Sequence, residues 1–370
     1  MKLAGIRPDI EDVQPYVAGK TIEEVKRQYK LEQVIKLGSN ENPWGPYPAA
    51  VKAMQQEVLQ LHTYPDNSFV EMKRKIAEMY GLDERWIAVS HGAGGMLETL
   101  AKTFVEPGAH ILIPQYTYGL YREISRLMGG RVEHTPVTGD MEIDMGRLRE
   151  RVRPNTRVVW LCNPNNPTGT VVDKADLFSF ARSLPEGCWL VLDEAYAEFA
   201  DQSLLPDRVE LIKEELPLVV VRTFSKAYGL AGARLGYAIA HPDLIKVIDT
   251  VAEPFNANRI GLAGAWATLE QEQVAVAETI AVVQAERGRL QTALTERGFI
   301  VYQSQANFIL FDAALPADQA AHDLLKQGVI VRSAAGWGLV SHIRVTVGKP
   351  SENNMFLAAL DRFTQKVRGE

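Results

Sequence analysis

The chain has 370 residues, of which 46% are hydrophobic and 23% charged, and its formal net charge is -6 at pH 7. These values are typical of a soluble globular protein with more than one domain, and they exclude a disordered or fibrous chain. Lys and Arg form no cluster along a helix face, so neither nucleic acid nor an anionic membrane is a predicted partner.

Neither the N-terminal segment nor the cysteines indicate export or a metal site. Residues 1–17 contain Pro and acidic residues and no apolar run, so no signal peptide is predicted. No apolar run approaches the roughly 20 residues that a membrane helix needs. Cys162 and Cys188 lie in apolar stretches without disulfide or metal-ligand spacing, which indicates buried free thiols. We therefore predict a cytoplasmic protein without a metal.

Short apolar runs alternate with amphipathic stretches in the middle of the chain, a pattern typical of βαβ units. The predicted strands are Trp86–Ser90, His110–Ile113, Val158–Cys162, Trp189–Leu192 and Leu218–Thr223, and the helices between them include Gly95–Val105 and Ala175–Ser183. These runs are apolar on both faces, as in strands that helices cover on each side. The predicted fold class is α/β, with a mainly parallel central sheet flanked by helices.

The pattern changes from about residue 260. A helical region rich in Ala, Glu and Gln is followed by short strands and a closing helix, at Ala263–Arg297, Phe308–Phe311, Val329–Val331, His342–Thr346 and Glu352–Val367. We predict a large α/β domain over residues 36–260 and a smaller α+β domain over residues 261–370. Residues 1–35 are predicted to form a segment that joins the small domain.

Ligands of open α/β sheets bind beyond the carboxyl ends of the strands, so the residues that follow each predicted strand are candidates for a site. Gly92–Gly95 opens a helix whose N–H groups suit a phosphate, although taken alone a tight turn explains it better. Tyr118 can stack on a flat ring or simply pack. Asn166 lies in a turn with Pro and Gly, and its amide can donate to a phenolate oxygen.

Two further strand ends carry charged residues. Asp193 closes an apolar run, so its carboxylate needs a partner such as a pyridinium N–H, unless it caps a helix or lies at a solvated strand end. Lys226 follows another apolar strand, where partial desolvation would make it a nucleophile, although alone it would be taken for a surface lysine. Arg234 lies eight residues further on and can pair with a phosphate that Thr223 and Ser225 also bind. Together these ends predict a site for a charged, planar, phosphorylated cofactor.

Four motifs occur in a fixed order along the chain: Ser39-Asn40-Glu41-Asn42-Pro43, Asn165-Asn166-Pro167-Thr168-Gly169, Asp193-Glu194-Ala195-Tyr196, and Ser225-Lys226 with Arg234. In this set and order the chain resembles the fold-type I aminotransferases that depend on pyridoxal 5'-phosphate (PLP), and within them the histidinol-phosphate aminotransferases. The likeness runs from about Tyr16 to the C-terminal helix. Each motif is weak alone, whereas the ordered set is specific.

The resemblance implies that PLP is the cofactor and that it forms a Schiff base with Lys226, which later shuttles a proton. Asp193 would keep the ring nitrogen protonated, while Tyr196 and Asn166 would bind the phenolic oxygen. The implied catalytic residues are thus Lys226, Asp193 and Tyr196. Tyr118 would stack on the ring. The implied phosphate ligands are Ala93, Gly94, Thr223, Ser225 and Arg234.

The resemblance also implies substrate-binding residues and a partner subunit. Arg344 would bind the substrate carboxylate as a planar fork, with Arg332 assisting at the anionic end. Tyr16 and Asn307 would line the same pocket. Tyr64 would reach the cofactor of a second copy, so the implied active unit is a homodimer.

The implied reaction is a step of histidine biosynthesis, in which histidinol phosphate and 2-oxoglutarate give imidazole acetol phosphate and glutamate. An aromatic amino-acid aminotransferase is an alternative, because imidazole and aromatic side chains need similar pockets. A PLP-dependent decarboxylase or lyase and a non-catalytic PLP-fold regulator are more distant alternatives. Gly94 and Gly95 stand where the family usually has an acidic pair. That change keeps the backbone contacts to a phosphate and leaves open its effect on substrate preference.

Overall fold

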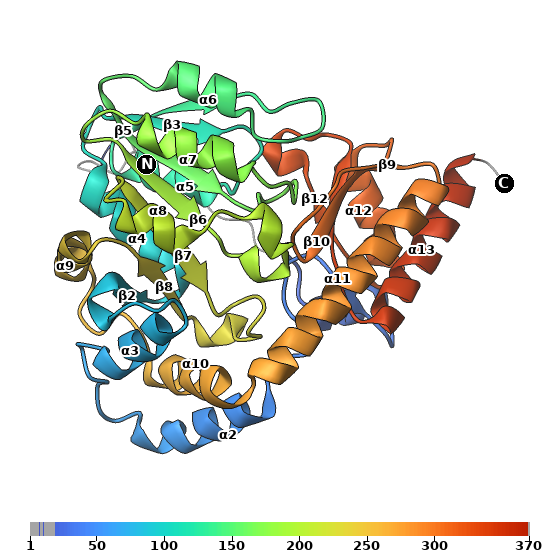
Figure 1. Cartoon of the computed structure of the whole chain (residues 1–370). Coiled ribbons are helices and arrows are strands. Elements are labelled where there is room, and N and C mark those ends of the chain that lie inside the picture. The colour runs from blue at the N-terminus through green and yellow to red at the C-terminus, as the bar shows by residue number, and fades with distance from the viewer. Residues whose placement is uncertain (1–6, 8–9, 11–18, 369–370) are drawn as a thin grey trace.

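The computed structural model describes Arg7, Ile10 and residues 19–368. A seven-stranded sheet forms the centre of the larger part of the molecule, in the order β2-β8-β7-β6-β5-β3-β4 (Figure 1). Its strands are β2 (Ile87–Ser90), β3 (His110–Pro114), β4 (Arg131–Thr135), β5 (Thr156–Cys162), β6 (Trp189–Asp193), β7 (Leu218–Thr223) and β8 (Gly236–Ile239). Only β8 runs against its neighbours. The predicted α/β class with a mainly parallel sheet is confirmed.

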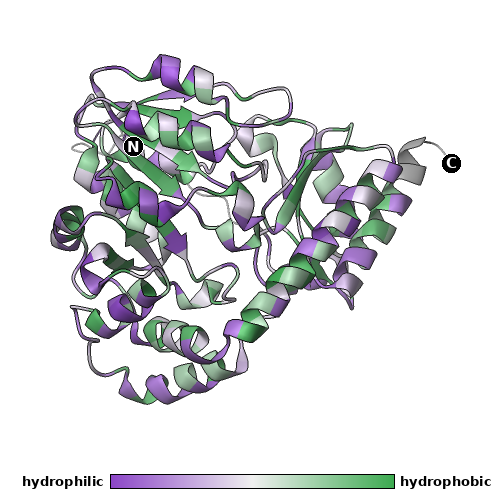
Figure 2. Cartoon of the chain, viewed as in Figure 1, coloured by the Kyte–Doolittle hydropathy of each residue, from purple (hydrophilic) through white to green (hydrophobic). Residues whose placement is uncertain are grey.

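The five predicted strands all form, and their burial explains why the sequence indicates them. β2, β3 and β7 are buried along their whole length, and β5 and β6 at all but one position each. Figure 2 shows these strands as apolar ribbons between helices of mixed hydropathy. The sequence reasoning missed β4, an edge strand with only one buried residue, and the four-residue β8.

Helices cover both faces of the central sheet and pack against the second part of the chain (Figure 1). They are α1 (Ile22–Tyr29), α2 (Pro48–Glu57), α3 (Val70–Glu78), α4 (Gly92–Phe104), α5 (Leu120–Leu127), α6 (Met145–Arg151), α7 (Lys174–Arg182), α8 (Arg208–Lys213), α9 (Pro242–Val251), α10 (Arg259–Gln271), α11 (Gln273–Glu296), α12 (Ala317–Lys326) and α13 (Pro350–Arg368). The predicted helical region 263–297 is two helices, which separate at Glu272. The Glu272 carboxylate accepts from the backbone N–H of Ala49, at the start of α2, at 2.6 Å. The break lets α10 pack along α2 while α11 runs on to the other sheet.

A second, four-stranded sheet has the order β12-β13-β10-β9, and all its pairs are antiparallel. Its strands are β9 (Ile300–Val301), β10 (Phe308–Asp312), β12 (Arg332–Ser333) and β13 (His342–Thr346). β1 (Ile35–Lys36) pairs in parallel with β11 (Val329–Ile330), so residues close to the N-terminus lie against the C-terminal part of the chain. The division at residues 35 and 260 stays a prediction.

Cys162 and Cys188 are buried and free, as predicted. Burial raises the pKa of both thiols, that of Cys188 to about 12. None of the helices formed by the described residues has an apolar stretch that could span a bilayer.

Candidate active site

Asp193, Tyr196 and Lys226 come together at the carboxyl edge of the central sheet. Asp193 is the last residue of β6 and Lys226 follows β7, the neighbouring parallel strand. The Lys226 ammonium nitrogen lies 5.6 Å from the centre of the Tyr196 ring. The predicted catalytic residues therefore lie near one another at this edge of the sheet, although they come from different elements.

Lys226 is a partly buried amine held by a neutral acceptor. Its Nζ donates to the carbonyl oxygen of Ser39 at 3.1 Å. Burial, followed by the positive charges of Arg344 and Arg234, lowers the pKa of Lys226 from 10.5 to about 8, against the opposing effect of Glu41 and Asp193. The amine is thus neutral in a large fraction of molecules near pH 8, which a nucleophile requires.

Asp193 is a buried carboxylate oriented by two hydrogen bonds. Its Oδ2 accepts from the Tyr121 hydroxyl at 2.7 Å and its Oδ1 from the backbone N–H of Ala195 at 3.0 Å. Burial raises the pKa of Asp193, while these two bonds and Lys226 oppose the rise. The sequence left open a ligand partner, a helix cap and a solvated strand end. Asp193 is 3% exposed, so its strand end is not solvated, and its backbone contact is with the loop that carries Tyr196 rather than with the start of a helix.

Asn166 and Tyr196 are each tied to a residue from a distant part of the chain. Asn166 Oδ1 accepts from Arg344 Nη1 at 2.5 Å. The Tyr196 hydroxyl accepts from Asn40 Nδ2 at 3.1 Å, and burial raises its pKa. Both side chains are 5% exposed, so their polar atoms are shielded from bulk water at this edge of the sheet.

Small residues at the start of α4 let the guanidinium of Arg234 approach the helix N-terminus. A Cβ on Gly92 would lie 2.7 Å from Arg234 Nη2, and a Cβ on Gly236 would lie 2.5 Å from the backbone N of Ala93. Arg234 Nη1 donates to the Ser225 hydroxyl at 3.4 Å. The structure thus brings together backbone N–H groups, a hydroxyl and a cation, the donors that a phosphate needs. The other predicted members of this group are Gly94, in the first turn of α4, and the buried Thr223, whose hydroxyl accepts from the Ser225 N–H.

Two arginines and two aromatic rings form the side of the site contributed by the second sheet. Arg332 and Arg344 are partners in the register of β12 and β13. Both guanidinium groups lie over the Trp337 ring, at 5.8 and 5.4 Å from its centre, and that of Arg344 also lies 5.2 Å from the centre of Phe308. Such stacking occupies the faces of a guanidinium and leaves hydrogen bonds to its edges, where Arg344 donates from Nη1 to Asn166 and from Nη2 to the carbonyl oxygen of Gly38 at 2.8 Å.

Asn307, a further predicted substrate residue, is buried and donates to the carbonyl oxygen of Asn40 at 3.1 Å. Its Oδ1 has no hydrogen-bond partner among the residues that the structure describes. A buried acceptor without a partner is costly, which is consistent with a position that contacts a ligand. Tyr16, predicted to lie nearby, falls outside the described residues.

The structure places the two remaining predicted residues differently from each other. Tyr118 packs edge-on against Tyr121, with ring centres 5.5 Å apart, and so lies close to the Asp193 region. Tyr64 is 76% exposed and stacks on Phe255 at 4.5 Å, and its carbonyl accepts from Arg259. Tyr64 thus contacts Phe255 and Arg259 rather than the residues at the strand ends of its own chain.

The sequence reasoning missed three residues with clear positions in the site: Tyr121, Asn40 and Trp337. Tyr121 follows Tyr118 by one helical turn, and this spacing was the available signal. Asn40 lies in one of the motifs, but no local pattern shows that it bonds to a tyrosine 156 residues away. Trp337 lies between two strands that each carry an arginine, which gives no signal until those strands pair.

Comparison with known proteins places the chain in a family. A profile of the family described as aminotransferase class I and II matches residues 32–360. The chain is 38% identical over 360 residues to histidinol-phosphate aminotransferase 2 of Methylococcus capsulatus, with 96% of this chain and 97% of the relative covered. It is 36% identical over 358 residues to histidinol-phosphate aminotransferase of Symbiobacterium thermophilum, with 97% and 98% covered.

A solved structure leads to the same family. The histidinol-phosphate aminotransferase of Sinorhizobium meliloti, solved in complex with pyridoxal-5'-phosphate, has a TM-score of 0.90 and 29% sequence identity, and the match covers 99% of each chain. This confirms the predicted fold-type I architecture and the resemblance that the motifs indicated. The chain belongs to the aminotransferase class I and II family, in which the relatives that it matches along nearly its whole length are histidinol-phosphate aminotransferases.

Proposed function

We propose that this protein is a PLP-dependent aminotransferase that converts histidinol phosphate and 2-oxoglutarate into imidazole acetol phosphate and glutamate. The observation that carries the proposal is the convergence of Lys226, Asp193 and Tyr196 at one edge of the sheet, beside Arg344. The family and the names of its full-length relatives support the choice of reaction.

The residues present fit the cofactor. The backbone at the start of α4, beside Arg234, has room for a phosphate only because Gly92 and Gly236 have no Cβ. The buried carboxylate of Asp193 lies at the end of β6. When bound, PLP supplies an electron sink for the electron pair left on the substrate Cα. Lys226 would hold it through Nζ and Asp193 would face its ring nitrogen. The other proposed ligands are Asn166 and Tyr196 for the phenolic oxygen, Tyr118 for the ring face, and Ala93, Gly94, Thr223, Ser225 and Arg234 for the phosphate.

Lys226 is the residue suited to proton transfer. Its lowered pKa lets Nζ take a proton from the donor's Cα near neutral pH and give it up again. Tyr196, whose pKa is raised by burial, stays a neutral phenol and can donate a hydrogen bond throughout the reaction. The two roles require the side chains to lie close together, as they do here.

Arg344 and Arg332 would bind the anionic end of both substrates, with Asn307 and Tyr16 lining the same pocket. The two guanidinium groups share the Trp337 ring and lie on paired strands, so they can address one anion from two positions. A phosphate on one substrate and a carboxylate on the other are both suited to such a pair.

A homodimer is the proposed active unit, with Tyr64 reaching the cofactor of the partner subunit. Tyr64 stacks on the exposed Phe255 and closely follows the exposed Val58, Leu59 and Leu61 in the chain, and exposed apolar side chains of this kind are typical of a protein interface. Size measurement by light scattering tests the dimer. Mixing Tyr64→Phe and Lys226→Ala protomers then tests whether Tyr64 acts in the partner's site.

Two further expectations remain proposals. We place the large PLP-binding domain at residues 36–260, the small domain at 261–370, and the segment 1–35 with the small domain, which the pairing of β1 with β11 supports. A cytoplasmic location is supported by the two free buried thiols.

Turnover with three amino donors, in the presence of 2-oxoglutarate, tests the reaction. Histidinol phosphate should be used with a kcat/KM well above those of phenylalanine and tyrosine. If phenylalanine is preferred, the protein is an aromatic aminotransferase, and release of carbon dioxide instead of keto product would indicate a decarboxylase. The Lys226→Ala protein should lose turnover and the visible absorbance that borohydride abolishes, whereas Lys246→Ala, at an exposed lysine, should keep both.

A further inference from the structure

Tyr121 is a fully buried tyrosine that no motif singles out. It lies in the first turn of α5, the helix that follows β3, and its hydroxyl donates to Asp193 Oδ2 at 2.7 Å. The two residues are separated by 72 positions in the sequence. A buried hydroxyl without a partner is costly, so the position of Tyr121 is tied to the presence of this carboxylate.

The ring of Tyr121 is fixed by aromatic neighbours on two sides. The Trp160 ring is parallel to it, within 3° and with centres 5.5 Å apart, and Tyr118 meets it edge-on at 5.5 Å. Trp160 is itself held by a hydrogen bond of 3.0 Å from its indole N–H to the Ser125 hydroxyl. These contacts fix the ring so that the Tyr121 hydroxyl is directed at Asp193.

The groups around Asp193 have opposite effects on its pKa. Burial favours the protonated acid, and so does the negative charge of Glu194 behind it. Hydrogen bonds from Tyr121 and from the Ala195 N–H favour the carboxylate, as does the charge of Lys226. Cys162, on the adjacent strand β5, also faces this region, but burial keeps it a neutral thiol. The Tyr121 hydroxyl thus supplies a side-chain hydrogen bond, at 2.7 Å, that favours the ionised form of Asp193.

We propose that Tyr121 is a positioning residue, whose hydroxyl holds Asp193 ionised and oriented so that the ring nitrogen of bound PLP, and not Asp193, keeps the proton between them. This proposal rests on the proposed function, because it assigns Asp193 to the ring nitrogen. It adds a residue from α5 to the groups that set the electronic state of the cofactor.

The test compares the wild-type holoenzyme with Tyr121→Phe, using PLP labelled with ¹⁵N in its ring. In the wild type the ring-nitrogen NMR signal should lie at the protonated position. In Tyr121→Phe it should move toward the unprotonated position, and PLP should dissociate roughly tenfold more readily, the effect of one lost hydrogen bond to a charged group. The matched control is Tyr237→Phe, which removes a fully buried hydroxyl that bonds only to Tyr80 among the contacts recorded, at 2.7 Å. It should leave both readouts unchanged.

A folded Tyr121→Phe protein with the wild-type ring-nitrogen signal and PLP affinity would overturn the proposal. If that variant does not fold, wild-type holoenzyme labelled with ¹³C in its aspartate carboxyl groups decides the matter. An ionised Asp193 carboxyl signal at neutral pH supports the proposal and a protonated one overturns it. Failure of the proposed function is distinct, because the wild-type protein would then neither bind PLP nor turn over.

Discussion

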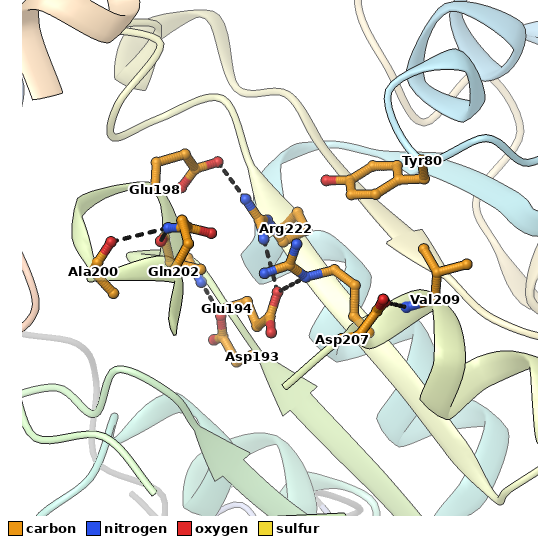
Figure 3. Close-up of polar contacts among 12 residues, drawn as sticks. Tyr80, Asp193, Glu194, Glu198, Ala200, Gln202, Asp207, Val209 and Arg222 are labelled. Carbon is orange, nitrogen blue, oxygen red and sulfur yellow. Dashed lines mark hydrogen bonds and ion pairs between the residues drawn. The ribbon is translucent and has the colours of Figure 1, made fainter. Parts of the chain in front are cut away.

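The two faces of the central sheet differ sharply where β6 and β7 end. Asp193 and Thr223 point to the face that carries the candidate site, while their chain neighbours Glu194 and Arg222 lie on the other face. Figure 3 shows Arg222 between Glu194 and Glu198, with Asp193 lying apart from these ion pairs. Two pairs of neighbouring residues, at the ends of β6 and β7, thus place one member in the candidate site and the other in an ion cluster.

The ion cluster on the second face is balanced in charge, although Glu194 Oε1 and Arg222 Nε have no hydrogen-bond partner among the described residues. Arg222 donates to Glu194 and to Glu198, both at 2.7 Å, and Arg208 donates to Glu194 at 2.6 Å. Two arginines thus match two glutamates. Because Arg222 joins both ends of the segment 194–198, it also fixes the loop that carries Tyr196.

The candidate catalytic face is arranged in the opposite way. Asp193 accepts its two recorded hydrogen bonds from uncharged donors, and Lys226 donates to a carbonyl oxygen. Charges on this face are therefore oriented without being neutralised by one another, which suits a ligand that brings charges of its own. One face of the sheet therefore uses charged residues for stability, whereas the other uses them for chemistry.

The largest effect is expected from Asp193→Asn. It should lower kcat by about 10³-fold, because the amide cannot stabilise a protonated ring nitrogen. Stability should change little, because burial raises the pKa of Asp193 and the carboxylate therefore costs folding free energy at neutral pH. Steady-state kinetics and thermal unfolding measure both. An unfolded Asp193→Asn protein would show that this carboxylate has the structural role assigned to the other face.

The converse experiment is Arg222→Met. Loss of the guanidinium leaves the buried Glu194 and the partly buried Glu198 without their shared cation, which should lower the free energy of unfolding by about 3–5 kcal/mol. The kcat of the folded fraction should fall by less than about tenfold, since the residue does not face the site. Urea denaturation and active-site titration measure these quantities.

The matched control for Arg222 is Arg182→Met, which removes an exposed arginine paired with Glu214. Its urea midpoint should match that of the wild type, because exposed ion pairs contribute little. If Arg222→Met is as stable as this control yet loses kcat as Asp193→Asn does, the division between the two faces is wrong.

A pH titration compares the two basic side chains, Lys226 and Arg222. Burial opposes ionisation of both, but Glu198 and other neighbours keep the pKa of Arg222 well above its usual value, whereas that of Lys226 is lowered to about 8. The rate at which apoprotein captures PLP should therefore rise with pH to a midpoint near 8 rather than 10.5. Stopped-flow absorbance measures the midpoint.

The same titration has a consequence for stability. Between about 8 and 10.5 the unfolded chain keeps a proton on Lys226 that the folded apoprotein has lost, so the apoprotein should become more stable as pH rises through this window. Arg344→Gln removes a charge that lowers this pKa, and it should move the capture midpoint upward. A midpoint above 10 in the unaltered protein would contradict the description of the site.

The sequence was sufficient to predict β2, β3, β5, β6 and β7 and the residues that follow them, but not β8, a strand of only four residues inside the sheet. β3, β5, β6 and β7 are apolar on both faces, and this pattern is local. β4 could not be found in the same way, because an edge strand with exposed polar residues has no such pattern. Glu272, which ends α10, is helix-compatible in composition, and only its contact with α2 reveals the break.

Within the site, the sequence located groups and left their partners unknown. Asp193 was predicted to need a partner, but Tyr121 lies on another element and reaches it only through the packing of α5 on the sheet. Glu194 belongs to the same motif as Asp193, and nothing local shows that it faces the opposite way into an ion cluster. Its partner Arg222 is likewise the chain neighbour of a candidate site residue, Thr223, and faces away from the site. The alternation of side chains along a strand implies that neighbouring residues lie on opposite faces of the sheet. Which residues then form ion pairs depends on how the strands pack in the fold.

Within the ion cluster, the smallest effect is expected from Arg208→Met, at the rim of the cluster. The Arg208 side chain is 17% exposed and that of Arg222 is 5% exposed. Water can partly replace Arg208, and Glu194 keeps its bond to Arg222, so the free energy of unfolding should fall by only about 1 kcal/mol. A double-mutant cycle with Arg222→Met, followed by urea denaturation, measures the coupling between the two arginines. If Arg208→Met alone costs as much free energy of unfolding as Arg222→Met, both arginines contribute equally to the stability of the cluster. The cluster then has no separate centre and rim, and its stability belongs to all four charges together.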